Sequence, residues 1–308
     1  MSLRHIFIIN PTAGRHDTSS ATVRKIEEVC RRHSLEYDIY LTSHPGHATD
    51  IVKKAGKAHD RQQLIFYACG GDGTLNEVVN GAAALGDNCA VAVYPIGTGN
   101  DYVKMFSGGK KAFMDLDRLV RGTPAKVDCI ISDCGCALNV LSVGLDAQVT
   151  MRKDKYSFLG GGILPYCMSA LESVIRGIGR EYYVNIDGVQ YDGDYSMVFI
   201  GNGRYYGGGF CPVPHSRIDD GMLDVLLVDK ISRLQAAGVV GKYKQGRYKE
   251  LGKYLRYVRA KELKIYSRDS NDMCINLDGE IVESSRITFR VEPGRINFII
   301  PEGSGMID

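Results

Sequence analysis

Long apolar runs are missing from this chain of 308 residues, and so is a strong excess of charge of either sign. No stretch reaches the roughly 18 apolar residues that a membrane-spanning helix requires, so we expect no segment to span a membrane. Residues 1–5 lead directly into a strand-like run without the architecture of a secretory signal, which favours a cytoplasmic location. The formal net charge of +2 is too small to indicate nucleic acid as a partner.

The nine cysteines lack the spacing of a disulfide framework or of a metal site. Their number is odd and most lie in apolar runs, which indicates buried free thiols in a reducing compartment. Cys134 and Cys136 are close in sequence, but no second pair and no nearby histidine completes a zinc site. We therefore expect no metal at these cysteines.

Two common nucleotide-binding motifs are also absent. The chain has no Gly-x-x-x-x-Gly-Lys-Ser/Thr sequence, and its glycine turn at residues 70–74 is not a strict Gly-x-Gly-x-x-Gly fingerprint. A P-loop NTPase and a hydride-transferring Rossmann enzyme are therefore disfavoured.

Strand-like and helix-like runs alternate up to about residue 130. Strands are expected at residues 5–9, 35–41, 64–68 and 90–94, and helices at residues 22–30, 48–58 and 74–85. This order predicts an α/β, doubly wound parallel sheet, in which ligands bind at the carboxyl ends of the strands.

From about residue 127 the pattern changes to strands separated by glycine and Asp-Gly turns, which indicates antiparallel pairing. Strands are expected at residues 137–143, 181–186, 195–201, 223–228, 262–266, 273–277 and 286–291, with a helix around residues 164–175 and a basic segment around residues 231–259. The length predicts two domains. We expect a second, mainly antiparallel β-sandwich domain and a cleft between the two domains. The last apolar run, residues 296–300, could complete either one.

Three glycine turns follow strands of the first domain, at residues 10–14, 70–74 and 95–101. Glycine lacks a Cβ, so the backbone can bend sharply and approach an anion closely. The helix after residues 70–74 adds free N–H groups and the positive end of its dipole. An ordinary connection would explain one such loop, but three at one edge of a sheet favour a phosphate site.

Polar side chains accompany the central turn. Asp72 puts a carboxylate where a phosphate should bind, which makes sense if Mg²⁺ or a reacting hydroxyl joins them. Asn76 lies in the first turn of the following helix. Glu77 fits equally well as a Mg²⁺ ligand or as a favourable charge at the positive end of the helix dipole.

Together these motifs resemble the diacylglycerol kinase catalytic domain, specifically the soluble bacterial lipid kinases of that family. The match covers nearly the whole chain, and its pieces occur in family order at residues 10–14, 42, 46–48, 70–76, 97–101, 207–209, 219–224 and 277–280. The ordered set is far more specific than any one motif.

The resemblance implies a nucleotide-binding α/β domain of residues 1–128 plus about 294–308, and a β-rich lipid-substrate domain of residues 129–293. The C-terminal strand would thus return to the first domain. The resemblance also implies an ATP site built from Asn10, Pro11, Thr12, Ala13, Gly14, Thr42, Gly70, Gly71, Asp72, Gly73, Thr74, Leu75, Asn76 and Thr98.

A structural Mg²⁺ is implied near the Asp-Gly pair at residues 220–221. By this resemblance Asp220 binds through its side chain, Arg217 and Met222 through carbonyls, and Asp101 through water. The residues alone say less, because Asp-Gly pairs are ordinary hairpin turns and a solvated turn would also explain the acidic cluster at residues 219–224. Clustered carboxylates nevertheless repel one another unless a cation or a proton intervenes.

The general base implied by the resemblance is Glu280, with Asp278 beside it. Asp72 is the rival, because the resemblance extends to sphingosine kinases, which use the Asp of that glycine motif. Phosphoryl transfer depends mainly on position and charge neutralisation, so one such base would accept the proton of the attacking hydroxyl.

The acceptor implied is a lipid, most directly diacylglycerol, with phosphatidylglycerol or a sphingoid base as alternatives. An NAD kinase and a phosphofructokinase share the turn at residues 70–74, but the motifs at 97–101 and 278–280 favour a lipid kinase over both. A non-catalytic binding module is the third alternative, and it would be expected to lose a catalytic carboxylate. ATP, Mg²⁺ and a lipid are thus the expected partners, and a homodimer stays open.

The basic segment between residues 242 and 259 is rich in tyrosine. It contains Lys242, Lys244, Arg247, Lys249, Lys253, Arg256 and Arg259, one acid, Glu250, and Tyr243, Tyr248, Tyr254 and Tyr257. This composition suits an anionic headgroup layer and predicts peripheral membrane association. A solvated basic helix with its tyrosines on the inner face explains it equally well.

Overall fold

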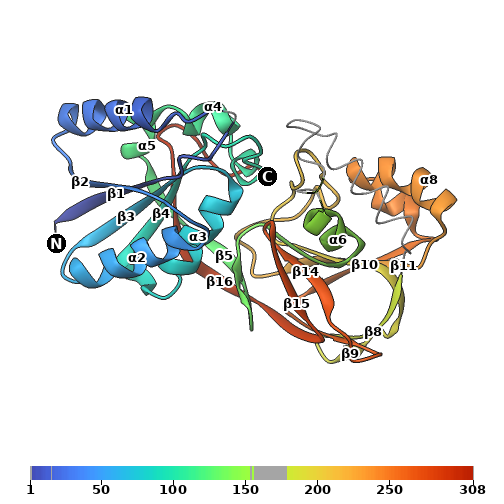
Figure 1. The fold of residues 1–308 in the computed structure, drawn as a ribbon. Helices are drawn as coiled ribbons and strands as arrows, with labels where there is room; N and C mark the ends of the chain where they lie inside the picture. The colour runs from blue at the N-terminus through green and yellow to red at the C-terminus, as the bar shows by residue number, and fades with distance from the viewer. Residues whose placement is uncertain (1, 15, 153–154, 156–178, 308) are drawn as a thin grey trace. The chain divides into compact units, whose positions relative to one another are not determined.

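The computed structural model describes residues 2–14, 16–152, 155 and 179–307. The chain divides into two compact units, Met1–Asp128 with Gly294–Asp308 (unit 1) and Cys129–Pro293 (unit 2), whose ribbons are drawn in Figure 1. The helix expected around residues 164–175 and Cys167 lie outside the described residues. The other eight cysteines are free thiols, as expected.

Unit 1 is a doubly wound α/β unit. Its parallel strands run in the order β2-β1-β3-β4, followed by the end of β16. The bounds are β1 Leu3–Ile9, β2 Glu36–Leu41, β3 Gln63–Cys69, β4 Cys89–Tyr94 and β16 Arg286–Ile300, with helices α1 Ser19–Arg32, α2 His47–Ala58 and α3 Asp72–Ala82. Figure 1 shows α1 on one face of the sheet and α2 and α3 on the other.

The strands at the centre of this sheet are buried on both faces. Residues 6–9 of β1 are inaccessible to solvent, and so are residues 66–69 of β3, because helices cover both sides of a doubly wound sheet. The apolar run at residues 296–300 forms the last part of β16, where Phe298 pairs with Val91 of β4. This run therefore completes unit 1.

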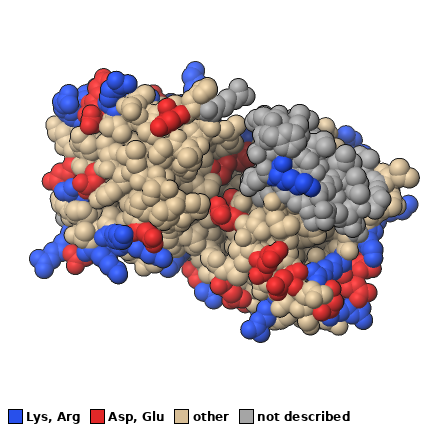
Figure 2. All heavy atoms as spheres, viewed as in Figure 1, with Lys and Arg blue, Asp and Glu red and all other residues tan. Residues whose placement is uncertain are grey.

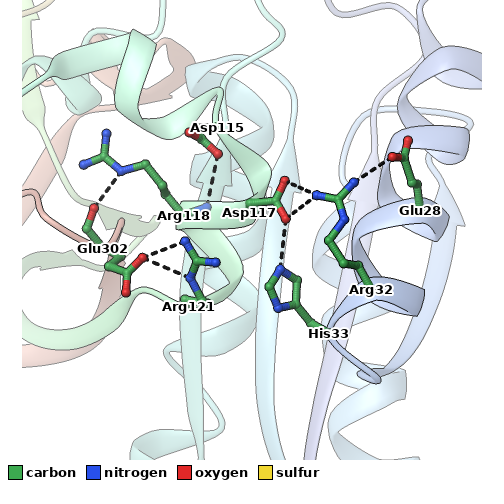
Figure 3. Close-up of polar contacts among 8 residues, drawn as sticks. All are labelled: Glu28, Arg32, His33, Asp115, Asp117, Arg118, Arg121 and Glu302. Carbon is green, nitrogen blue, oxygen red and sulfur yellow. Dashed lines mark hydrogen bonds and ion pairs between the residues drawn. The ribbon is translucent and has the colours of Figure 1, made fainter.

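Unit 1 also contains four short helices, η1 Gly86–Asn88, η2 Tyr102–Met105, α4 Gly109–Phe113 and α5 Leu116–Val120. Arginines on and beside α5 bind Glu302, in the chain that follows β16. In Figure 3, Arg118 Nε donates to the carbonyl oxygen of Glu302 at 2.7 Å, and Arg121 pairs with the Glu302 carboxylate. Asp117 of the same helix accepts from both Arg32 and His33. Polar contacts thus join α1, α5 and the C-terminal segment.

Unit 2 is built from antiparallel strands. Its elements are β5 Thr123–Ser132, which begins in unit 1, β6 Gly135–Ala137, β7 Val140–Gly144, α6 Leu145–Arg152, β8 Arg180–Ile186, β9 Val189–Gln190, β10 Gly193–Gly201, β11 Leu223–Asp229, α8 Arg233–Lys244, η4 Tyr248–Leu251, β12 Leu255–Ala260, β13 Glu262–Ser267, β14 Met273–Leu277, β15 Glu280–Ser284 and the first part of β16. The predicted fold class is confirmed: an α/β unit followed by an antiparallel β unit.

One expectation for unit 2 is wrong, and one of its strands was not expected. The single strand expected at residues 137–143 is split into β6 and β7 around Asn139. The basic segment comprises α8, η4 and strand β12, which pairs with β11. Tyr243 and Tyr248 are buried in the core there, so neither ring is available to a headgroup layer.

None of the helices within the described ranges combines the length and the hydropathy that crossing a bilayer requires.

Candidate active site

The three glycine turns of unit 1 lie at the carboxyl ends of β1, β3 and β4, as the sequence predicts. β1 pairs with β2 on one side and with β3 on the other, so the strand order reverses between β1 and β3. Ligands of open α/β sheets bind at such a reversal, outside the carboxyl ends of the strands. The loops at residues 10–14 and 70–74 flank this point.

Asn10 joins these two loops. Its Nδ2 donates to Thr74 Oγ1 at 3.1 Å, while its Oδ1 accepts from the backbone N–H and the hydroxyl of Thr12. Ala13 N donates to the Asn10 carbonyl, which closes the turn that contains Pro11. The Asn-Pro-x-x-Gly sequence thus folds as a compact turn fixed to the start of α3.

The loops at residues 70–74 and 95–101 touch backbone to backbone. Gly97 N donates to Gly70 O at 2.9 Å, and Asn100 Nδ2 donates to the same oxygen at 3.0 Å. A Cβ on Gly97 would lie 2.4 Å from the Cα of Gly71, so only glycine allows this approach. Gly14 has a φ of 90°, and a Cβ there would lie 3.0 Å from Ile96 O. All three loops are therefore in mutual contact.

Asp72 is the first residue of α3 and holds the third loop. Its carboxylate accepts from Asp101 N at 2.9 and 3.1 Å. Burial raises the pKa of Asp72, and the neighbouring Asp101 carboxylate raises it further, while the backbone N–H donors act in the opposite direction. Asp101 in turn pairs with Lys104 at 2.5 Å. In this geometry Asp72 positions the loop at residues 97–101.

Glu77 does not cap its own helix. Its carboxylate accepts from Gly46 N at 2.9 Å and Ala48 N at 3.0 Å, at the start of α2. The sequence left two roles open for Glu77: a Mg²⁺ ligand, or a favourable charge at a positive helix end. The observed contacts are with a positive helix end, but it is that of the neighbouring helix α2. Thr42 is held at the end of β1 by its N–H bond to Ile9 O at 2.9 Å.

The remaining residues predicted to form the ATP site differ in their exposure to solvent. Thr98 and Gly14 are exposed, Gly71 and Gly73 are half-buried, and Leu75 and Asn76 are buried on α3. Asn76 accepts from Asn80 Nδ2 through its side-chain oxygen at 3.0 Å.

Lys110 was missed by the sequence reasoning. Its ammonium donates to Gly97 O at 2.6 Å and to Asn100 Oδ1 at 3.4 Å. It lies thirteen and ten residues beyond the two residues that it contacts, so no spacing rule indicates it.

In unit 2, Asp278 and Gly279 form a two-residue hairpin turn between β14 and β15, with φ values of 50° and 103°. Asp278 directs its carboxylate away from the turn, to the backbone N–H groups of residues 138–140. The three N···O distances are 2.7 Å at Leu138, 3.2 Å at Asn139 and 2.7 Å at Val140. Asp278 therefore fixes the hairpin on the junction of β6 and β7, and the exposed Glu280 follows directly.

Asn139 is a second residue that the sequence reasoning missed. Its Nδ2 donates to Tyr205 O at 2.5 Å, and its carbonyl accepts from the N–H groups of Asn202 and Gly203. It explains the break between β6 and β7, since its peptide is bound to Asp278 on one side and to residues 202–203 on the other. An asparagine within an apolar run is the only signal that the sequence offers.

The predicted metal ligands of unit 2 lie in one turn. Asp220 accepts from Met222 N at 3.0 Å and from Arg259, whereas the Arg217 guanidinium pairs with Asp219. One carboxylate with main-chain carbonyls is a hard-oxygen donor set that fits Mg²⁺, which keeps several of its waters. Arg259 is a competing cation at the same carboxylate.

No cluster of three or more His, Cys, Asp or Glu side chains is placed to hold a metal within the described residues. Any ion bound at the residue 217–222 turn would therefore rely on the Asp220 carboxylate together with carbonyl oxygens and water. The neighbouring Asp224 accepts from Tyr257 Oη at 2.5 Å. Burial raises the pKa of Tyr257, and its bond to Asp224 raises it further.

Family models match both parts of the chain. Residues 4–131 match the family model of the diacylglycerol kinase catalytic domain, and residues 139–300 match that of the YegS C-terminal NAD kinase beta sandwich-like domain. A probable lipid kinase YegS-like protein of Pseudomonas aeruginosa is 28% identical over 287 residues, covering 92% of this chain and 91% of that protein. A diacylglycerol kinase of Staphylococcus carnosus is 26% identical, covering 91% and 89%.

Solved structures show the same fold. A crystal structure of a diacylglycerol kinase from Bacillus anthracis superposes with a TM-score of 0.69 at 19% identity, covering 97% of each chain. Another structure from that organism reaches a TM-score of 0.76 at 23% identity, covering 97% of this chain and 98% of the other.

Proposed function

The chain belongs to the diacylglycerol kinase and YegS family of lipid kinases, and from this premise we propose that it transfers the γ-phosphoryl group of ATP to the hydroxyl of diacylglycerol. The alternative acceptors are phosphatidylglycerol and a sphingoid base. Phosphorylation of NAD, as by an NAD kinase, is the least favoured alternative. The observation that carries the proposal is the mutual contact of three glycine loops at the strand-order reversal of unit 1. We assign the activity to the cytoplasm, at the membrane surface.

Unit 1 binds the nucleotide in this proposal. The turns at residues 10–14 and 70–74 supply backbone N–H groups and small hydroxyl side chains to the phosphates, and α3 directs its N-terminus toward the same turns. Asn10 and Asp72 keep the loops together, and Thr42 and Thr98 border the site. Because these contacts are already made, little loop ordering is needed when nucleotide binds.

Unit 2 supplies the base. The substrate hydroxyl gives its proton to the Glu280 carboxylate as its oxygen bonds to the γ-phosphorus, and the bond from that phosphorus to the bridging oxygen of ADP breaks. Asp278 holds the hairpin that carries Glu280, so it acts as a positioning residue. Asp72 remains the rival base, and its bonds to the loop at residues 97–101 favour a positioning role for it too.

The family implies ATP and typically a divalent metal, which neutralises phosphate charge when bound. In unit 2, Asp220 with the carbonyls of Arg217 and Met222 would hold a structural Mg²⁺. The resemblance also implies that Asp101 of unit 1 binds this ion through water.

The test is one assay of the purified chain with radiolabelled ATP and a panel of acceptors: diacylglycerol, phosphatidylglycerol, sphingosine and NAD. The proposal expects label in phosphatidic acid and little elsewhere. Label in another lipid would identify a different acceptor and would still support a lipid kinase. Label in NAD alone, or in none of them, would contradict the proposal.

A further inference from the structure

Helix α8 of unit 2 is firmly seated by one face. Its residues Val239 and Tyr243 are buried and pack with Phe199 of β10 and Leu226 of β11. A capping box fixes its first turn: Ser232 N donates to Gln235 Oε1 at 2.7 Å, and Gln235 N donates to Ser232 Oγ at 3.3 Å. The opposite face is thereby held in one orientation.

The middle of the helix contains no charged residue. Residues 234–241 include no Asp, Glu, Lys or Arg. Leu234 is 89% exposed, the highest value among the large apolar residues that the structure describes, and Val240 is 50% exposed. Gly238 lies between them and Gly241 follows Val240, both with open space beside their Cα atoms. Helices that face water normally carry charged residues on their outer side, so this face (Leu234, Gly238, Val240 and Gly241; the α8 outer face) is unusual.

Cations follow directly after this face. Lys242, Lys244, Arg247, Lys249 and Lys253 lie between residues 242 and 254, with Glu250 as the one acid. Lys242 and Arg247 pair with Glu250, whereas Lys249 and Lys253 are exposed. Figure 2 shows further blue Lys and Arg side chains at the edge of this part of the molecule.

An apolar face beside a cationic end is the arrangement of interfacial helices, which insert apolar side chains and pair their cations with anionic headgroups. We propose that the α8 outer face, with Lys249 and Lys253 beside it, docks this chain on an anionic lipid bilayer. This inference rests on the proposed function and deepens it by naming the docking surface. Two tyrosines of the basic segment, Tyr243 and Tyr248, do not serve, because they are buried.

The inner side of α8 connects this surface to the glycine loop at residues 207–209. Tyr243 Oη lies 3.2 Å from Tyr206 Oη, and Cys211 N donates to Lys244 O at 2.9 Å. Tyr206 and Phe210 are bridged across that loop. A bilayer bound at α8 would therefore lie beside a loop that belongs to the family motifs.

The experiment is sedimentation of the full chain with vesicles of phosphatidylcholine, with and without phosphatidylglycerol. We expect wild type to bind the mixed vesicles more tightly than the neutral ones. The double variant L234E/V240E should bind the mixed vesicles about tenfold more weakly, because two apolar side chains no longer enter the bilayer and two acids face its charge. V189E is the matched control, since Val189 is 55% exposed on β9 of the same unit, and it should bind like wild type.

A second variant tests the cations: K249E/K253E should lose the preference for anionic vesicles and much of the sensitivity to salt. The docking proposal is overturned if L234E/V240E binds like wild type, if wild type binds neither vesicle, or if the variant instead converts a wild-type dimer to a monomer. Activity on a water-soluble, short-chain diacylglycerol separates the two proposals. L234E/V240E should phosphorylate this soluble substrate as fast as wild type does. If neither protein is active on it, the proposed kinase function is contradicted, and the vesicle sedimentation alone decides the docking proposal.

Discussion

Asp72 in unit 1 and Asp278 in unit 2 both lie beside glycine in a tight turn, and both direct their carboxylates to main-chain N–H groups. Asp278 accepts from three residues of a buried strand junction. Asp72 accepts chiefly from one, Asp101, whose own carboxylate repels it. An aspartate in a signature motif can thus act by holding a neighbouring loop. The loss in the free energy of unfolding when it is removed depends on how many N–H donors are left unpaired.

The largest effect is expected for Asp278→Asn. The amide offers one oxygen where two are used, and its NH₂ group would face the buried N–H groups of residues 138–140. We expect a loss of about 2–4 kcal/mol in the free energy of unfolding of unit 2, with faster amide exchange at those three positions. Wild-type exchange protection there would show that Asp278 does not hold the junction.

A smaller loss is expected for Gly97→Ala, which tests whether unit 1 depends on backbone contact more than on its aspartate. The new Cβ would meet the Cα of Gly71 at 2.4 Å, so the loops must separate at a cost of about 1–3 kcal/mol. Gly71→Ala is the matched control, because its Cβ would meet no described atom closer than 3.8 Å. Thermal unfolding of the two variants should differ clearly, and equal stability would contradict the close approach.

Asp72→Asn is expected to cost less, about 1 kcal/mol or less. The remaining oxygen can still accept from Asp101 N, and the repulsion between two carboxylates disappears. Because the folded pKa of Asp72 is raised, its ionisation costs stability above that pKa, and this cost is relieved as the pH falls. The variant should therefore lose this acid-side gain in a pH series of unfolding. A loss as large as that of Asp278→Asn would break the comparison.

The smallest effect concerns Arg259, which supplies a cation to Asp220 and lies 3.9 Å from Asp224. Arg259→Ala should cost about 0.5–1 kcal/mol, as for exposed ion pairs. Magnesium should then raise the melting temperature of the variant more than that of wild type, because the competing cation is gone. An equal response, reversed equally by EDTA, would argue against Mg²⁺ at Asp220.

The sequence predicted β1–β4 and α1–α3 of unit 1 to within a few residues, because β1, β3 and β4 are mostly apolar and α1 has regular apolar spacing. It did not indicate the short helices η1, η2, α4 and α5. It did not predict strand β12, because Arg256 and Arg259 made these residues look like part of a basic segment. The loops of the candidate site were evident from their glycines. Lys110 and Asn139 were not evident. Lys110 contacts residues 13 and 10 positions away, and Asn139 is bonded to residues 66 and 139 positions away.

The measurement that tests the account most directly is turnover of Glu280→Gln with diacylglycerol and radiolabelled ATP, alongside calorimetric titration of nucleotide. If Glu280 accepts the proton of the substrate hydroxyl, turnover should fall by about 10²–10⁴-fold, while the affinity for ATP stays close to that of wild type. Wild-type turnover in this variant would contradict the account and return the role of base to Asp72.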